Sequence, residues 1–102
     1  MNVPIVEAAL IKVHQDIQRD SGYDPKAVKA NTCPLLELPG FDSLLIPIAF
    51  RTVARMLDIP LPEGYRVPNI YVVHDGNRRL SISEIAGEFA QIFSVKAKAK
   101  AA

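Results

Sequence analysis

Residues 43–57 form the most apolar stretch of the chain, and they follow a Pro39-Gly40 pair that predicts a loop. Asp42 is a favoured N-cap residue, so the pattern predicts a helix over about 43–58. Its apolar residues lie on almost every side, which is typical of a helix that is buried on most faces or contacts a partner. They are Leu44, Leu45, Ile46, Ile48, Ala49, Phe50, Val53, Ala54, Met56 and Leu57. Because 102 residues can bury one core, we expect a single domain organised around this helix.

Ser43 occupies the first position of this expected helix, where backbone N–H groups have no intrahelical partner. Free N–H donors and the helix dipole both favour negative charge, so the position suits a phosphate group. The alternative is that Asp42 and Ser43 simply cap the helix. Pro47 would be the fifth helical residue and would remove one backbone hydrogen bond, so we expect a kink or a tight first turn. Pro60 and Pro62 end the helix.

Arg51 and Arg55 share one face of this helix with Ser43 and Pro47, because the four residues are spaced by four. The two arginines form either a solvated edge or part of a docking surface. The sequence favours neither interpretation.

Residues 3–19 carry a second helical pattern, with Asn2 as a suitable cap and Ser21-Gly22 as a suitable stop. The apolar positions recur at intervals of three and four: Val3, Val6, Leu10, Val13 and Ile17. His14 lies between this stripe and the polar side, so we expect an ordinary boundary histidine rather than a ligand or a base.

The connection between these two helices, residues 20–42, is long for a compact domain. Such loops are usually functional or pinned by their own apolar residues. The candidates for pins are Tyr23, Val28, Leu35, Leu36 and Leu38. Residues 25–30 are expected to form at most a helical turn. Cys33 has no neighbouring basic residue or histidine in the sequence to activate its thiol, so we expect a small, half-buried filler.

The segment over about 69–80 contains the strand-like run Ile70-Tyr71-Val72-Val73 and the turn signal Asp75-Gly76. We therefore expect a short extended segment or a small hairpin here. His74-Asp75 invites a catalytic interpretation, but turn chemistry accounts for the aspartate.

The final helix begins with a capping box, Ser81 to Glu84, and Leu80 and Ile85 are placed as a hydrophobic staple. Its expected buried face consists of Ile82, Ile85, Ala86, Phe89, Ile92 and Phe93. We expect one domain over residues 1–95 and a frayed, solvated Lys/Ala-rich tail over 96–102.

Composition narrows the classes of function. Three of the 12 Lys and Arg residues lie at positions 96, 98 and 100, so the rest of the chain has 9 of them against 11 Asp and Glu residues. That balance argues against a nucleic-acid partner. The longest uncharged run is too short to span a bilayer, and residues 1–20 lack the pattern of a secretory signal. We expect a cytoplasmic, monomeric protein without a transmembrane segment.

Gly40-Phe41-Asp42-Ser43-Leu44 at the start of a helix resembles the attachment site of acyl carrier proteins, whose serine carries 4′-phosphopantetheine. The resemblance covers a short motif and gains weight from its setting, with one helix and a long loop before it and a further helix after it. It implies an all-α, acyl-carrier-like four-helix bundle with a long first loop. The segment over about 69–80 would replace or modify the third helix of that fold.

The resemblance also implies roles for residues and partners. A phosphopantetheinyl transferase using coenzyme A and Mg²⁺ would modify Ser43, and acyl-loading and acyl-transfer enzymes would then use the arm. Asp42 would place the serine, while Gly40 and Phe41 would shape the loop. An apolar slot for the acyl chain is expected between the helices, lined by Leu44, Ile48, Val53, Ile70, Val72 and Ile85.

The helix after the serine is the recognition surface of that family, where it typically carries acidic residues. Here the matching positions hold Leu45, Ile48, Ala54 and Arg55, and with Arg51 we expect Leu45, Ile48 and Arg55 to contact partners. Because charge complementarity selects partners, this departure predicts a specialised carrier, for example in lipopolysaccharide or unusual fatty-acid synthesis.

Three alternatives stay open. A small helical interaction module would use the apolar helix without any modification, and a stand-alone peptidyl carrier would differ only in its cargo. A hydrolase would use Asp42-Ser43-Leu44 with His14 or His74 as the base, but Phe41 displaces the glycine of that motif and the chain is short for such a fold.

Overall fold

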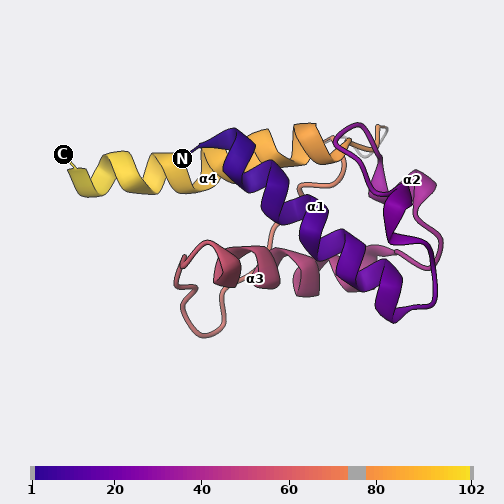
Figure 1. Cartoon of the computed structure of the whole chain (residues 1–102). Coiled ribbons are helices and arrows are strands. Elements are labelled where there is room, and N and C mark those ends of the chain that lie inside the picture. The colour runs from indigo at the N-terminus through magenta and orange to yellow at the C-terminus, as the bar shows by residue number, and fades with distance from the viewer. Residues whose placement is uncertain (1, 74–77, 102) are drawn as a thin grey trace.

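The computed structural model of the chain describes residues 2–73 and 78–101 (Figure 1). Within these ranges the backbone forms four α-helices and no strand, which confirms the all-α class. The α-helices are α1 (Val3–Asp20), α2 (Pro34–Glu37), α3 (Ile46–Met56) and α4 (Ile82–Ala101), and two single 3-10 turns are η1 (Pro25–Ala27) and η2 (Ser43–Leu45).

Helix α1 has the ends that the sequence predicts. The Asn2 side chain accepts a hydrogen bond from the Ile5 amide at 3.3 Å, and Gly22 follows the helix with φ +86°. The buried face differs from the expected stripe, because Val3 is exposed whereas His14 and Gln18 are fully buried. The prediction that His14 lies at the boundary is therefore wrong. Two polar residues one turn apart point into the core.

The core lies where α1 crosses α3 and α4 (Figure 1). Phe50 of α3 meets Phe89 and Phe93 of α4, with ring centroids 4.9 and 6.1 Å apart. The other apolar residues buried on the three long helices are Val6, Ala9, Leu10, Val13, Ile46, Ala49, Val53, Ala54, Ile82, Ile85, Ala86 and Ala90. These contacts join segments that are far apart in the chain, so the three helices form one packed unit.

The long first loop is held by η1, α2 and the start of α4. Val28 and Leu38 are buried as predicted, whereas Tyr23 and Leu36 are exposed and do not act as buried pins. The loop also supplies carbonyl groups to α4, because the amides of Ile82 and Ser83 donate to Thr32 and Ala30 at 2.8 and 2.9 Å. This contact joins backbone groups about 50 residues apart, so no local pattern predicts it.

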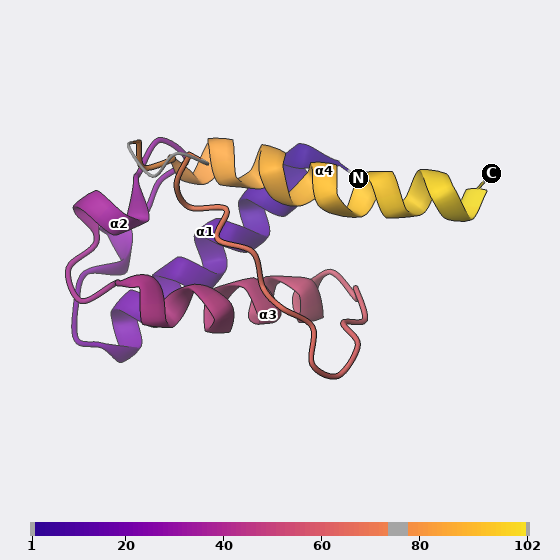
Figure 2. The same cartoon turned by 180° about the vertical axis from the view of Figure 1, so that it is seen from behind.

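The chain between α3 and α4 runs as an extended segment past α3 to the start of α4 (Figure 2). Val72 and Arg79 form an antiparallel bridge. The amide of Val73 donates to the carbonyl of Arg78, and the amide of Leu80 donates to the carbonyl of Tyr71, at 2.8 Å each. The residues on either side of the predicted turn therefore pair as in a small hairpin. The turn itself, with His74 and Asp75-Gly76, lies outside the described residues.

Helix α4 begins with the predicted capping box. The Ser81 amide donates to Glu84 Oε1 at 3.0 Å, and the Glu84 amide donates to Ser81 Oγ at 3.2 Å. Leu80 and Ile85 are both buried, as expected of a staple. The helix continues through Ala101 and extends beyond the other helices (Figure 1). The fraying of the Lys/Ala segment stays a prediction.

Candidate functional site

Ser43 begins the turn η2 and is exposed. Asp42 is extended, with φ −137° and ψ −177°, and its carboxylate accepts a hydrogen bond from the Leu44 amide at 3.0 Å. Asp42 is therefore the N-cap, as predicted. Across the described part of the chain, the Ser43 hydroxyl has no hydrogen-bond partner. The hydroxyl is free to react with a group that approaches from solvent.

The first turn differs from the expected helix over 43–58. It is a 3-10 turn over Ser43–Leu45, followed by α3 from Ile46 with Pro47 in its first turn. This arrangement removes the conflict that Pro47 would create in a helix interior, because the amide nitrogen of a first-turn residue needs no intrahelical partner. The tight first turn was one of the two expected outcomes.

The amides of this turn are occupied. The Leu44 amide donates to Asp42 Oδ1, the Leu45 amide to the Asp42 carbonyl at 3.0 Å, and the Ile46 amide to the Ser43 carbonyl. Three of the N–H groups that we expected to be free for a phosphate therefore already have partners within the turn.

The loop before Asp42 is anchored at Pro39 and Phe41, and Gly40 between them has a positive φ. The Pro39 carbonyl accepts a hydrogen bond from Gln18 Nε2 at 3.2 Å. Gly40 has φ +75°, and a Cβ there would lie 2.9 Å from the ring of Tyr23. Phe41 is buried in the core. The exposed Ser43 turn is thus attached to a fixed base, and sequence reasoning missed Gln18 as part of it.

Phe41 packs in a buried cluster with His14 and Tyr71. Its ring centroid lies 5.1 Å from that of His14 and 5.6 Å from that of Tyr71. His14 Nδ1 is 2.7 Å from the Leu10 carbonyl, which can only accept, so Nδ1 carries the proton. His14 Nε2 then accepts a hydrogen bond from the Tyr71 hydroxyl at 2.8 Å. The hydrogen bond between His14 and Tyr71 thereby joins α1 to the hairpin, and Phe41 from the loop before Ser43 packs against both rings.

Burial controls the ionisation of this pair. Desolvation lowers the pKa of His14 to about 4, against a weaker opposing effect of its bond to Leu10. Desolvation also raises the pKa of the Tyr71 phenol above its ordinary value. His14 is therefore neutral at pH 7 and has both ring nitrogens engaged, so it is not available as the base of a hydrolase.

The residues that we expected to line an acyl slot differ widely in burial. Leu44 and Ile48 are 80% and 55% exposed, whereas Val53 and Ile85 are fully buried in the core. Ile70 and Val72 line a separate groove of about 790 Å³ between the 68–80 segment and α4. The six residues that we expected to form one slot do not line one cavity.

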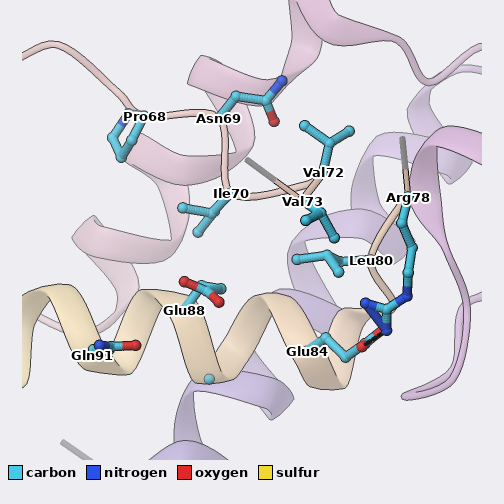
Figure 3. A pocket seen from close by; sticks show the side chains of 11 residues that line it. Pro68, Asn69, Ile70, Val72, Val73, Arg78, Leu80, Glu84, Glu88 and Gln91 are labelled. Atoms are coloured by element: carbon cyan, nitrogen blue, oxygen red, sulfur yellow. Dashed lines mark hydrogen bonds and ion pairs between the residues drawn. The ribbon is translucent and has the colours of Figure 1, made fainter. Parts of the chain in front are cut away.

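The groove beside α4 has one apolar and one polar wall. Ile70 lies across from Glu88, and Arg78 forms an ion pair with Glu84 at the end near the hairpin (Figure 3). A carboxylate beside an apolar wall is unfavourable for an acyl chain, because the charged group loses solvent on contact.

The expected partner-binding residues differ in exposure. Ile48, Arg51 and Arg55 are exposed on α3, while Leu45 is half-buried against the core.

Cys33 is half-buried, as predicted. Its partial burial raises the pKa of the thiol, and the neighbouring Glu37 carboxylate raises it further. A raised pKa keeps the thiol protonated and unreactive at neutral pH.

Neither a metal cluster nor a membrane-crossing helix is found over residues 2–73 and 78–101. No group of three or more His, Cys, Asp or Glu side chains there is arranged to hold a metal ion. No helix in the same ranges combines the length and apolar character needed to cross a membrane.

Comparisons with known proteins do not identify a relative. No protein-family model matches the chain, and no curated protein or solved structure is significantly similar to it.

Replacing Gly40 with Ala is expected to lower the free energy of unfolding by about 2 kcal/mol, because it adds left-handed strain and displaces the Tyr23 ring. Gly64→Ala is the matched control, since Gly64 has φ +77° but a Cβ there meets nothing within 4 Å. That variant should lose about 1 kcal/mol. Urea unfolding of both variants checks the difference, and equal losses would show that Tyr23 does not restrain Gly40.

Proposed function

We propose that this protein is a carrier that bears 4′-phosphopantetheine on Ser43 and transports an acyl group as a thioester on that arm. The observation that carries the proposal is an exposed serine with an unengaged hydroxyl, directly after a loop anchored at Pro39 and Phe41. The sequence Gly40-Phe41-Asp42-Ser43-Leu44, which resembles the carrier attachment site, falls at this turn.

The residues of the turn fit covalent attachment. A transferase needs to reach the hydroxyl of Ser43 without rearranging the core, and the exposure of Asp42, Ser43 and Leu44 meets that need. The buried Phe41 ring and the Asp42 cap fix the direction of the turn. The pantetheine thiol supplies the acyl attachment, and the tether raises the effective concentration of the cargo at each partner enzyme.

The partners in this proposal are a phosphopantetheinyl transferase and enzymes that load and remove the acyl group. The exposed face of α3, with Ile48, Arg51 and Arg55, is the proposed contact surface. Its basic residues support a specialised carrier of a lipid pathway with enzymes of its own. A stand-alone peptidyl carrier would use the same serine.

A second candidate is a protein-interaction module without modification. The exposure of Leu44 in η2 and of Ile48 and Met56 on α3 favours it, because exposed apolar surface often marks contacts. This candidate predicts that Ser43 stays unmodified and that the apolar face alone determines binding.

The deciding experiment is intact mass after incubation with coenzyme A, Mg²⁺ and a broad-specificity phosphopantetheinyl transferase. The wild type is expected to gain one phosphopantetheine group, and Ser43→Ala none, with unchanged circular dichroism. Ser21→Ala is the matched control, since Ser21 is also exposed but ends α1. Absence of a gain on folded wild type, or a gain that persists in Ser43→Ala, would contradict the proposal and favour the interaction module.

A further inference from the structure

A small pocket lies beside the C-terminal half of α3, on the side of its two arginines. It has a volume of about 280 Å³ and is lined by Arg51, Ala54, Arg55, Ile59 and Leu61. Arg51 and Arg55 are one helical turn apart, and both side chains line this space. The other three residues give it an apolar wall.

The two arginines have no carboxylate partner in the described part of the chain. The ion pairs found there join Lys12 and Arg19 to Asp16 and Arg78 to Glu84. Arg51 donates instead to the Tyr65 carbonyl at 2.6 Å, which holds its side chain toward the following loop. Like charges four residues apart disfavour a helix, whereas the position of Arg55 in the last turn of α3 is favourable to the helix dipole. An external anion between the two arginines would relieve their mutual repulsion.

The apolar wall is fixed by the way α3 ends. The Ile59 amide donates to the Ala54 carbonyl at 2.8 Å and the Asp58 amide donates to the Arg55 carbonyl at 3.1 Å, while Asp58 has φ +56°. These two bonds and the left-handed residue define a Schellman motif, which brings Ile59 back against Ala54. The wall is therefore set by backbone hydrogen bonds and is ready before any ligand arrives.

We propose that this pocket binds a glutamate or aspartate side chain of a protein partner. The carboxylate lies between the guanidinium groups of Arg51 and Arg55, and the aliphatic carbons contact Ala54, Ile59 and Leu61. The volume lies just below the range of small-molecule sites and suits one side chain. Ile48, which is 55% exposed, extends the contact surface along the same helix. The inference rests on the partner-binding part of the proposed function and names the chemistry of that partner.

The test uses two short peptides, acetyl-Leu-Glu-Leu-amide and acetyl-Leu-Gln-Leu-amide, titrated into the full-length protein and followed by two-dimensional NMR. The Glu peptide is expected to shift the signals of Arg51, Arg55, Ile59 and Leu61 saturably at millimolar concentration, and raised salt should weaken it. The Gln peptide and the Arg55→Gln variant should each weaken binding about tenfold. Arg66→Gln is the matched control, because Arg66 is exposed but does not line the pocket, and it should bind as the wild type does.

Three results would overturn the proposal: no saturable shift with the Glu peptide, equal binding of the Gln peptide, or equal weakening by Arg66→Gln and Arg55→Gln. Hexanoate is titrated separately. Binding of hexanoate without binding of the Glu peptide would also overturn the proposal of a protein partner, and it would assign the pocket to small carboxylates. Neither Ser43 nor coenzyme A enters this test, so its failure is distinguishable from failure of the carrier proposal.

Discussion

Replacement of Phe41 with Ala is expected to lower the free energy of unfolding by about 3 to 5 kcal/mol. The ring is buried and contacts those of His14 and Tyr71, so its removal leaves a cavity among groups from three segments. The cavity cannot close easily, because His14 and Tyr71 are joined to each other and His14 to the Leu10 carbonyl. Urea unfolding at pH 7 measures the loss.

Phe50 provides the matched control for the functional part of this prediction. It is equally buried but packs on Phe89 and Phe93, on the α4 side of the core. Phe41→Leu and Phe50→Leu should each cost about 1 kcal/mol and leave a folded protein. Phosphopantetheine transfer to Ser43 should slow in Phe41→Leu only, because that ring fixes the turn. Equal rates in both variants would show that the buried anchor is structural and does not present the serine.

Lowering the pH from 7 to 5 is expected to remove about 2 kcal/mol of stability through His14 alone. The unfolded chain binds a proton at the ordinary histidine pKa of 6.5, whereas the folded protein does so only near pH 4. Because the folded pKa is the lower one, the contribution of neutral His14 is complete above pH 6.5. It is lost progressively between pH 6.5 and about 4. Urea midpoints at half-unit pH steps measure the slope.

The carboxylates of Asp16 and Glu84 affect the stability of the protein at lower pH than His14 does. A hydrogen bond from Lys12 lowers the pKa of Asp16, and hydrogen bonds from Ser81 lower that of Glu84. The stability that they contribute is lost only as the pH falls through their ordinary values, 3.8 and 4.5, and below. A scan that stops at pH 5 therefore reports mainly on histidine.

Variants separate His14 from other causes of the pH effect. His14→Leu should make stability nearly independent of pH between 7 and 5, and it should cost about 1 to 3 kcal/mol at pH 7 because the Tyr71 hydroxyl loses its buried partner. Adding Tyr71→Phe should recover part of that loss. His74→Gln should keep the pH dependence, and its disappearance in that variant would contradict the assignment to His14.

The ends of the helices were the most predictable part of the fold, because capping depends on neighbours in sequence. Asn2 caps α1, Asp42 caps the Ser43 turn, and Ser81 with Glu84 forms the capping box of α4. The hairpin was predictable for the same reason. The start of α3 was misplaced by three residues, because a 3-10 turn removes the conflict with Pro47 more simply than a kink.

The buried face of α1 was not predictable in full. His14 and Gln18 are polar, and the apolar stripe can be drawn without them. A shift of that stripe by one position places them in the core. There the Tyr71 hydroxyl donates to His14, and Gln18 Nε2 donates to the Pro39 carbonyl. Such partners, 57 and 21 residues away, cannot be read from local periodicity.

The sequence by itself determined the all-α class, the capping residues, the hairpin and the candidate serine, since each depends on short-range backbone chemistry. Only the tertiary structure decided which residues present that serine and which side of α3 meets solvent. Ile48 is as apolar as Val53, yet it is exposed, because α1 and the phenylalanines of α4 contact the other side of α3. The arginine pocket depends likewise on the loop after α3 returning to the helix, a contact made by backbone hydrogen bonds that no local pattern specifies.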